Sequence, residues 1–165
     1  MALTSKIARY DPSWPEQFEV ERLKLAPIFG DKLRSIEHVG STAVPTLAAK
    51  PEIDILVEIS DDSDLDFYSA QMRAIDYRRG GDLSPGHHFF KRDIDGIRTH
   101  KLHVCISGHW QIERLLRFRD LLRADPEIRM QYQELKLRLE AGNREGINEY
   151  LAQKAPFIDR LLDQH

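Results

Sequence analysis

The segment that most constrains the fold lies between residues 52 and 59, where apolar residues, mostly β-branched, alternate with other side chains. A period of two is typical of a β-strand, because successive side chains on a strand point to opposite faces. One face carries Ile53, Ile55, Val57 and Ile59, and the other carries Glu52, Asp54, Leu56 and Glu58. We therefore predict a strand whose apolar face meets the core and whose acidic face is directed away from it.

Further strands are predicted on both sides of this segment. Residues 33–39 read as a short strand that ends at Gly40, and residues 88–91 and 102–106 read as two more. Asp95-Gly96 between the last two is a tight-turn signal. These two strands should therefore pair as an antiparallel hairpin.

Helical patterns fill most of the remaining chain. They cover about 14–29, 64–75, 110–123, 126–142 and 145–162. Residues 61–63 can cap the second helix, and Asp125-Pro126 begins the fourth with a cap and a proline at the first helical position. Pro156 should kink or split the last helix, because proline lacks the N–H that a helix interior requires.

These elements predict an α/β (α+β) fold with a mixed sheet first and helices second. A chain of 165 residues has the usual size of one domain. We expect a single domain, with a sheet-containing core at 1–108 and C-terminal helices at 109–165.

Composition narrows the classes of partner. The net charge is -3 with acidic and basic residues interspersed, which argues against bulk nucleic-acid binding. The single cysteine, Cys105, cannot form an intrachain disulfide. No long apolar run suggests a signal peptide or a membrane span, so we expect a cytoplasmic protein with no membrane partner.

The loop at Gly40-Ser41-Thr42 and the acids that follow it form the first candidate site. Glycine allows a close backbone approach, and free N–H groups beside a serine hydroxyl can cradle a phosphate. Asp54 could hold Mg²⁺ or Mn²⁺ against that phosphate, with Glu52 on the same face. A plain turn and a solvated strand face are the alternatives.

His103 is a third candidate. It shares a face of its strand with Lys101 and Cys105, and this face should lie on the same side of the sheet as Asp54. A neutral imidazole can ligate a metal ion or act as a base, so His103 joins Asp54 and Glu52 as a candidate catalytic residue and metal ligand. A hydrogen-bonded structural histidine is the alternative.

Several motifs together resemble the GrpB-like family. They are Tyr10-Asp11-Pro12, Glu37 to Pro45, Leu47 to Pro51, Ile53-Asp54-Ile55, Phe89-Phe90-Lys91, Arg98-Thr99-His100, Phe118-Arg119-Asp120 and Lys154 to Ile158. This family is similar in fold to the nucleotidyltransferase superfamily, whose pattern is a Gly-Ser loop followed by two acids separated by one apolar residue. Glu52 and Asp54 match that pair. If Asp54 is instead the first acid, the position of the second acid holds Leu56. The superfamily's third acid comes from a later strand, where this chain offers His103.

The resemblance also implies roles for residues of the helical tail, because superfamily enzymes use lysine and tyrosine there to hold the triphosphate and base. Tyr132 and Lys136 lie one helical turn apart, and Lys154 interrupts an apolar stripe on the last helix. With Lys50, these lysines would balance phosphate charge. A solvated position for Lys136 and a salt bridge from Lys154 to Asp54 are the alternatives.

The leading hypothesis is a nucleotidyltransferase that binds a nucleotide triphosphate with Mg²⁺ or Mn²⁺ and transfers to an acceptor that the sequence does not specify. The partner would be a nucleotide or another phosphorylated small molecule. Two alternatives remain open at this point. One is a catalytically silent module that binds a nucleotide or another anion, or regulates a partner; the other is a metal-dependent hydrolase that uses His103 and Asp54.

Overall fold

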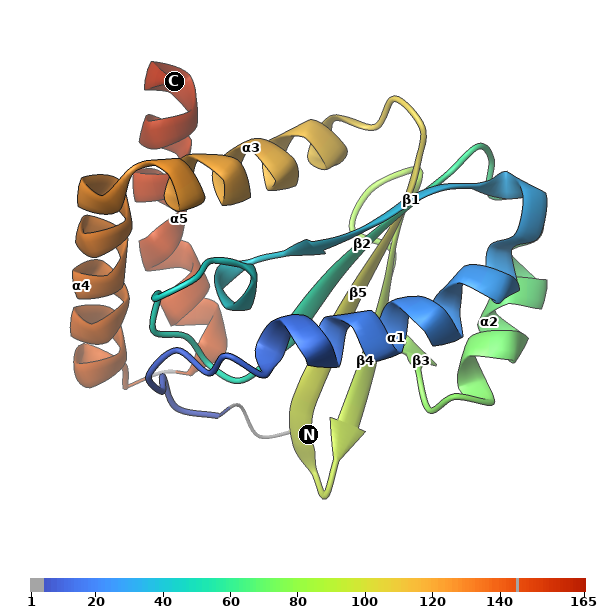
Figure 1. Cartoon of the computed structure of the whole chain (residues 1–165), viewed down its shortest axis with the longest axis horizontal. Coiled ribbons are helices and arrows are strands. Elements are labelled where there is room, and N and C mark those ends of the chain that lie inside the picture. Colours follow the sequence, from blue (N-terminus) through green and yellow to red (C-terminus); the bar gives the residue numbers. More distant parts are fainter. Residues whose placement is uncertain (1–4, 145) are drawn as a thin grey trace.

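A computed structural model describes residues 5–144 and 146–165. The helices are α1 (Trp14–Phe29), α2 (Leu65–Arg73), α3 (Trp110–Ala124), α4 (Pro126–Gly142) and α5 (Ile147–Gln164), with short 3₁₀ turns η1 (Gly30–Lys32) and η2 (Ser41–Ala43). The strands are β1 (Leu33–Val39), β2 (Ile53–Ile59), β3 (Arg78–Arg79), β4 (His87–Ile94) and β5 (Ile97–Ile106). Figure 1 shows the sheet between α1 and α3, with α4 and α5 at one end of the molecule.

The described residues form one five-stranded sheet in the order β1-β2-β5-β4-β3. Only the β2–β5 pair is parallel; the other neighbours run antiparallel, so the predicted mixed sheet is confirmed. The β4–β5 hairpin is also confirmed. Both residues of its turn, Asp95 and Gly96, have positive φ, as a tight turn of this kind requires.

Two details of the helices differ from the sequence prediction. Helix α2 begins at Leu65 after the N-cap residue Asp64, which makes no side-chain capping bond, whereas Asp61 of the predicted cap accepts hydrogen bonds from Ser63 and Lys32. Helix α5 continues through Pro156 and is not split. Packing on α4, including the stacked rings of Tyr132 and Phe157, holds the residues after the proline in place.

The core lies mainly on the face of the sheet that α1 and α2 cover. The alternating residues of β2 are at most 1% exposed there, and they pack with aromatic and apolar side chains of both helices. This confirms which face of β2 meets the core. Burial of such side chains contributes about 1.5–3 kcal/mol each to the free energy of folding, before chain entropy is subtracted.

The opposite face of β2 is only partly open, which corrects the prediction that it is directed away from the core. Leu56 is fully buried, together with Val39 and Cys105, beneath apolar residues of α3. Asp54 lies one strand repeat nearer the start of β2, at the end that faces α5. The helices therefore leave this face of the sheet uncovered where the side chain of Asp54 projects.

A third cluster attaches the helical segment to the loop that follows η2. Val44 and Leu47 are fully buried against α3, α4 and α5. This packing brings side chains from α4 and α5 against the loop and the start of β2. Within the part of the chain that the structure describes, no helix is both long and apolar enough to cross a membrane.

Candidate functional site

Gly40 joins β1 to η2 at a point where the backbone touches Asp54. Val39 is paired with Asp54 in the β1–β2 register, so the next residue passes over that carboxylate. Gly40 has a φ of 75°, and a Cβ placed on it would lie 2.1 Å from Asp54 Oδ2. Only glycine fits here without movement, because any larger residue would meet both a left-handed backbone and a carboxylate.

The two residues that follow Gly40 have different roles. Ser41 Oγ accepts a hydrogen bond from Lys136 Nζ at 3.0 Å and lines the pocket. Thr42 is buried, and its hydroxyl donates to the Glu52 carbonyl oxygen and lies 3.0 Å from His38 Nε2. The hydroxyl of Thr42 therefore holds the loop against the start of β2 and is engaged within the protein.

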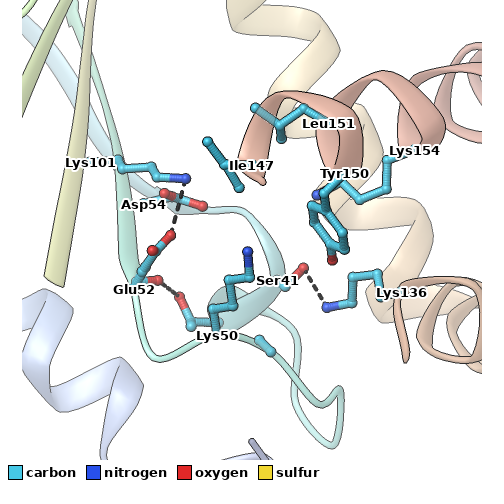
Figure 2. A pocket seen from close by; sticks show the side chains of 12 residues that line it. Ser41, Lys50, Glu52, Asp54, Lys101, Lys136, Ile147, Tyr150, Leu151 and Lys154 are labelled. Carbon is cyan, nitrogen blue, oxygen red and sulfur yellow. Dashed lines mark hydrogen bonds and ion pairs between the residues drawn. The ribbon is translucent and has the colours of Figure 1, made fainter. Parts of the chain in front are cut away.

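Asp54 and Glu52 form the acidic side of the pocket, as Figure 2 shows. Glu52 Oε2 pairs with Lys101 Nζ at 3.0 Å. Asp54 Oδ1 and Glu52 Oε1 are buried, and neither has a hydrogen-bond partner among the described residues. Burial raises the pKa of Asp54 to about 6, although the nearby ammonium group of Lys101 opposes the change.

Lysines from four separate segments surround these acids. They are Lys50 before β2, Lys101 on β5, Lys136 on α4 and Lys154 on α5. Together with the two carboxylates they line a pocket of about 60 Å³, which we call the lysine pocket. When all six groups are ionised, these described residues carry a net charge of +2.

The lysines on α4 and α5 are held in an unusual environment. Lys136 is 2% exposed, and its Nζ donates to the Ala48 carbonyl oxygen as well as to Ser41. Burial lowers the pKa of Lys136 to about 7 and that of Lys154 to about 8. Lys154 Nζ lies 4.9 Å from the centroid of the Tyr150 ring, and an electron-rich ring face favours a nearby cation. A bound anion would stabilise the charged form of both lysines.

Lys101 behaves differently from these two lysines. Burial pushes its pKa down, but Asp54 and Glu52 outweigh this effect and raise the pKa above its ordinary value. The β2–β5 register pairs Lys101 directly with Asp54. A permanently charged ammonium group thus lies beside both acids.

The metal site predicted from Asp54, Glu52 and His103 is not assembled. Among residues 5–144 and 146–165, no three His, Cys, Asp or Glu side chains are grouped so that they could hold an ion. The two unpaired carboxylate oxygens would suit a cation, but Lys101 already supplies a positive charge at that place. Lys101 would therefore have to move before a divalent ion could reach both acids.

His103 does lie on the same side of the sheet as Asp54, but it is level with Leu56 in the register. It contributes to a neighbouring cleft and not to the lysine pocket. Its Nδ1 is 2.8 Å from His87 Nε2, and burial together with His87 lowers its pKa to about 3. His103 is therefore neutral at physiological pH.

Lys101 and Tyr150 were not predicted as site residues, although both line the pocket. The period of two already placed Lys101 on the face of Asp54, and that signal could have identified it. Tyr150 precedes Lys154 by four residues, the spacing that puts two side chains on one helix face. The structure brings together the residues predicted to bind phosphate: the pocket is lined by Ser41, Thr42, Lys50, Lys136 and Lys154. Gly40 lies against Asp54, and Tyr132 is buried.

Solved structures show how widely this architecture occurs. The chain is similar to the conserved protein GrpB from Enterococcus faecalis, with a TM-score of 0.86 and 33% identity over 96% of this chain and 98% of that one. It is also similar to the Cid1 poly(U) polymerase bound to MgGTP, with a TM-score of 0.58 and 14% identity over 81% of this chain and 44% of that one. The second likeness shows a nucleotidyltransferase-like fold and nothing finer.

Sequence comparison leads to the family. The UPF0157 protein YqkA of Bacillus subtilis is 37% identical over 93% of this chain, which spans 45% of that relative's length. The UPF0157 protein BH1888 of Halalkalibacterium halodurans is 35% identical over 94% of this chain and 80% of the relative. A family model described as GrpB protein matches residues 4–164. The chain belongs to the GrpB family.

Proposed function

We propose that the protein binds the phosphate groups of a nucleotide, or of another phosphorylated small molecule, in the lysine pocket and without a resident metal ion. The observation that carries this proposal is the ammonium group of Lys101, which pairs with Glu52 beside Asp54. It supplies at this place the positive charge that a divalent ion would supply in a metal-dependent site.

The charge and the donors of the pocket support an anionic ligand. When all four lysines are charged they outnumber the two carboxylates, so a divalent cation alone would then add to an existing positive charge. A phosphate would instead neutralise that charge and accept charge-assisted hydrogen bonds from the lysines. Near pH 6 the carboxyl group of Asp54 is partly protonated and can itself donate to a phosphate oxygen.

A nucleotide is the first choice among phosphorylated molecules because of the fold. The Cid1 polymerase, which shares this architecture, was solved with MgGTP bound. The loop at Gly40 and Ser41 and the start of β2 supply a Gly-Ser turn beside acids, the arrangement that led us to expect nucleotide handling.

A second candidate is metal-dependent nucleotidyl transfer, and one observation favours it. Glu52 Oε1 and Asp54 Oδ1 are buried without a partner among the described residues. A metal ion arriving with a nucleotide would find these oxygens, provided that Lys101 moved away from Glu52. The hydrolase alternative has no comparable support, because His103 lies outside the lysine pocket and pairs with His87.

Lys154→Met tests the phosphate pocket directly. The substitution keeps the length of the side chain and removes its charge, so affinity for ATP and for inorganic tripolyphosphate should fall by about 1.5–3 kcal/mol, the scale of a hydrogen bond to a charged group. Stability without ligand should change less, because Lys154 is partly buried and its pKa is already lowered by burial. Isothermal titration and thermal unfolding would measure the two effects.

Lys32→Met is the matched control, since it removes the same charge at the opposite end of β1. It should leave both affinities unchanged. If Lys154→Met instead lowers stability equally with and without ATP and leaves affinity unchanged, Lys154 is a structural ion-pair residue and the pocket is not a phosphate site.

A further inference from the structure

A second cleft opens directly from the lysine pocket, and we call it the outer cleft. The two share part of their lining: Asp54, Lys101, Ile147, Leu151 and Lys154. The outer cleft adds Leu83, Phe89, Lys91, Arg98 and His103. It measures about 560 Å³, against about 60 Å³ for the lysine pocket, so a ligand too large for the pocket can extend into it.

The chemistry of the outer cleft differs from that of the pocket. Leu83 is 58% exposed and Leu151 is 44% exposed, and together with Phe89 and Ile147 they give the cleft an apolar floor. Such exposed apolar side chains gathered in one concave place are typical of a binding site, whereas scattered ones are not.

Phe89 is held firmly in this floor. A Cβ on Gly80 would lie 2.7 Å from its ring, so the ring packs directly on the backbone of that glycine. His103 contacts the ring with a centroid separation of 5.5 Å, and His103 is itself fixed by the hydrogen bond with His87. The aromatic surface is therefore already in place before a ligand arrives, which reduces the entropy cost of binding.

The register of β4 and β5 places this surface next to the cations. Phe89 is paired with His103, and Lys91 is paired with Lys101. An aromatic pair and a cationic pair thus lie side by side on one face of the sheet. A ligand that joins a flat ring to an anion matches this arrangement.

On the side of α4 the lysine pocket is closed. Tyr132 and Lys136 are each 2% exposed, and Tyr150 is 4% exposed. The part of a ligand that continues beyond its phosphates therefore has room in the outer cleft and not between the helices.

We propose that the outer cleft holds the nucleoside part of a nucleotide whose phosphates occupy the lysine pocket, with the base stacked on Phe89. The inference rests on the proposed function and makes it more specific. Stacking on an aromatic side chain accepts every base, because each base has a π face. The site would accordingly distinguish nucleotides from inorganic polyphosphate more strongly than it distinguishes one base from another.

The test compares the Kd values of ATP, GTP, CTP and UTP with that of inorganic tripolyphosphate, for the unmodified chain and for Phe89→Leu. All four nucleotides should bind the unmodified chain more tightly than tripolyphosphate, and the tightest of them about tenfold more tightly. Phe89→Leu should weaken that nucleotide about fivefold or more and leave tripolyphosphate unchanged, because leucine is apolar but cannot stack. Phe67→Leu, at a phenylalanine of α2 that is 58% exposed, is the control and should change neither Kd.

The outcomes separate the two proposals. Two results would show that the outer cleft holds no nucleoside: equal binding of tripolyphosphate and all four nucleotides to the unmodified chain, or equal weakening of both kinds of ligand by Phe89→Leu. Neither result would contradict phosphate binding in the lysine pocket. If neither kind of ligand binds, both proposals are overturned. A Phe89→Trp variant that regains nucleotide affinity would support stacking over a purely structural effect of the leucine.

Discussion

Gly40→Ala should lower the affinity for tripolyphosphate by about 100-fold or more and destabilise the fold by about 2–5 kcal/mol. The residue has positive φ, and the new Cβ would lie 2.1 Å from Asp54 Oδ2. The left-handed backbone costs about 1–2 kcal/mol for a residue with a side chain, and overpacking adds about 1–3 kcal/mol. Either the carboxylate or the loop must move, and both form the pocket.

Gly30→Ala provides the matched control. Gly30 also has positive φ, but a Cβ there would meet nothing within 4 Å. This variant should lose only the backbone contribution of about 1–2 kcal/mol and keep its affinity. Titration of both variants with tripolyphosphate and their chemical denaturation would separate the effect of backbone strain from the effect of the contact with Asp54. An affinity for Gly40→Ala within twofold of the unmodified chain would show that the loop and Asp54 do not form the binding site.

Affinity for sulfate should rise about 100- to 1000-fold as the pH falls from 9 to 6. The pKa is about 8 for Lys154 and about 7 for Lys136, so both lose their charge in the free protein above those values. An anion stabilises the ammonium forms, and binding therefore takes up protons; each pH unit above a pKa costs up to about tenfold per group. Sulfate is the suitable probe because it stays doubly charged over this range.

Asp54 adds a second, smaller rise below about pH 6, where its carboxyl group gains a proton and one negative charge leaves the pocket. Titrations at half-unit intervals of pH would measure both effects. In Lys154→Met the rise should be about tenfold smaller, because only Lys136 remains to be protonated in that range. The affinity of a metal site for its ion would instead fall as the pH is lowered, since its carboxylates must be deprotonated to bind the ion. Affinity that falls as the pH is lowered would therefore contradict our account.

Much of the fold could be predicted from local patterns. The alternation in β2 identified both the strand and its buried face, and Asp95-Gly96 identified the β4–β5 hairpin. These features depend on residues that are neighbours in the sequence. The family resemblance added the nucleotidyltransferase-like fold, which the structural comparison bears out.

The register between β2 and β5 could not be predicted in this way. The period of two places both Lys101 and His103 on the face of Asp54, but only the parallel register decides which one is level with it. From the sequence we expected His103 beside Asp54, whereas the structure pairs Lys101 with Asp54. That single step of register places an ammonium group, and not an imidazole, beside Asp54, and it is the reason why we propose anion binding.

The burial of Leu56 could not be predicted from the sequence either, because it depends on where α3 packs. From the sequence, Leu56 interrupted an acidic face and stood where the second acid would be if Asp54 were the first. In the structure it is fully buried with Cys105 under α3. An acid at that position would be buried beneath a helix, at a cost that a leucine avoids.

The central claim is that the lysine pocket binds phosphate without a metal ion, and one titration tests it most directly. Isothermal titration of the unmodified chain with tripolyphosphate would be carried out in excess EDTA and again in excess Mg²⁺. We predict saturable binding at one site per chain in EDTA, with Mg²⁺ leaving the affinity unchanged or weakening it by complexing the polyphosphate. Binding that is absent in EDTA and appears with Mg²⁺ or Mn²⁺ would contradict the claim and would favour the metal-dependent nucleotidyltransferase.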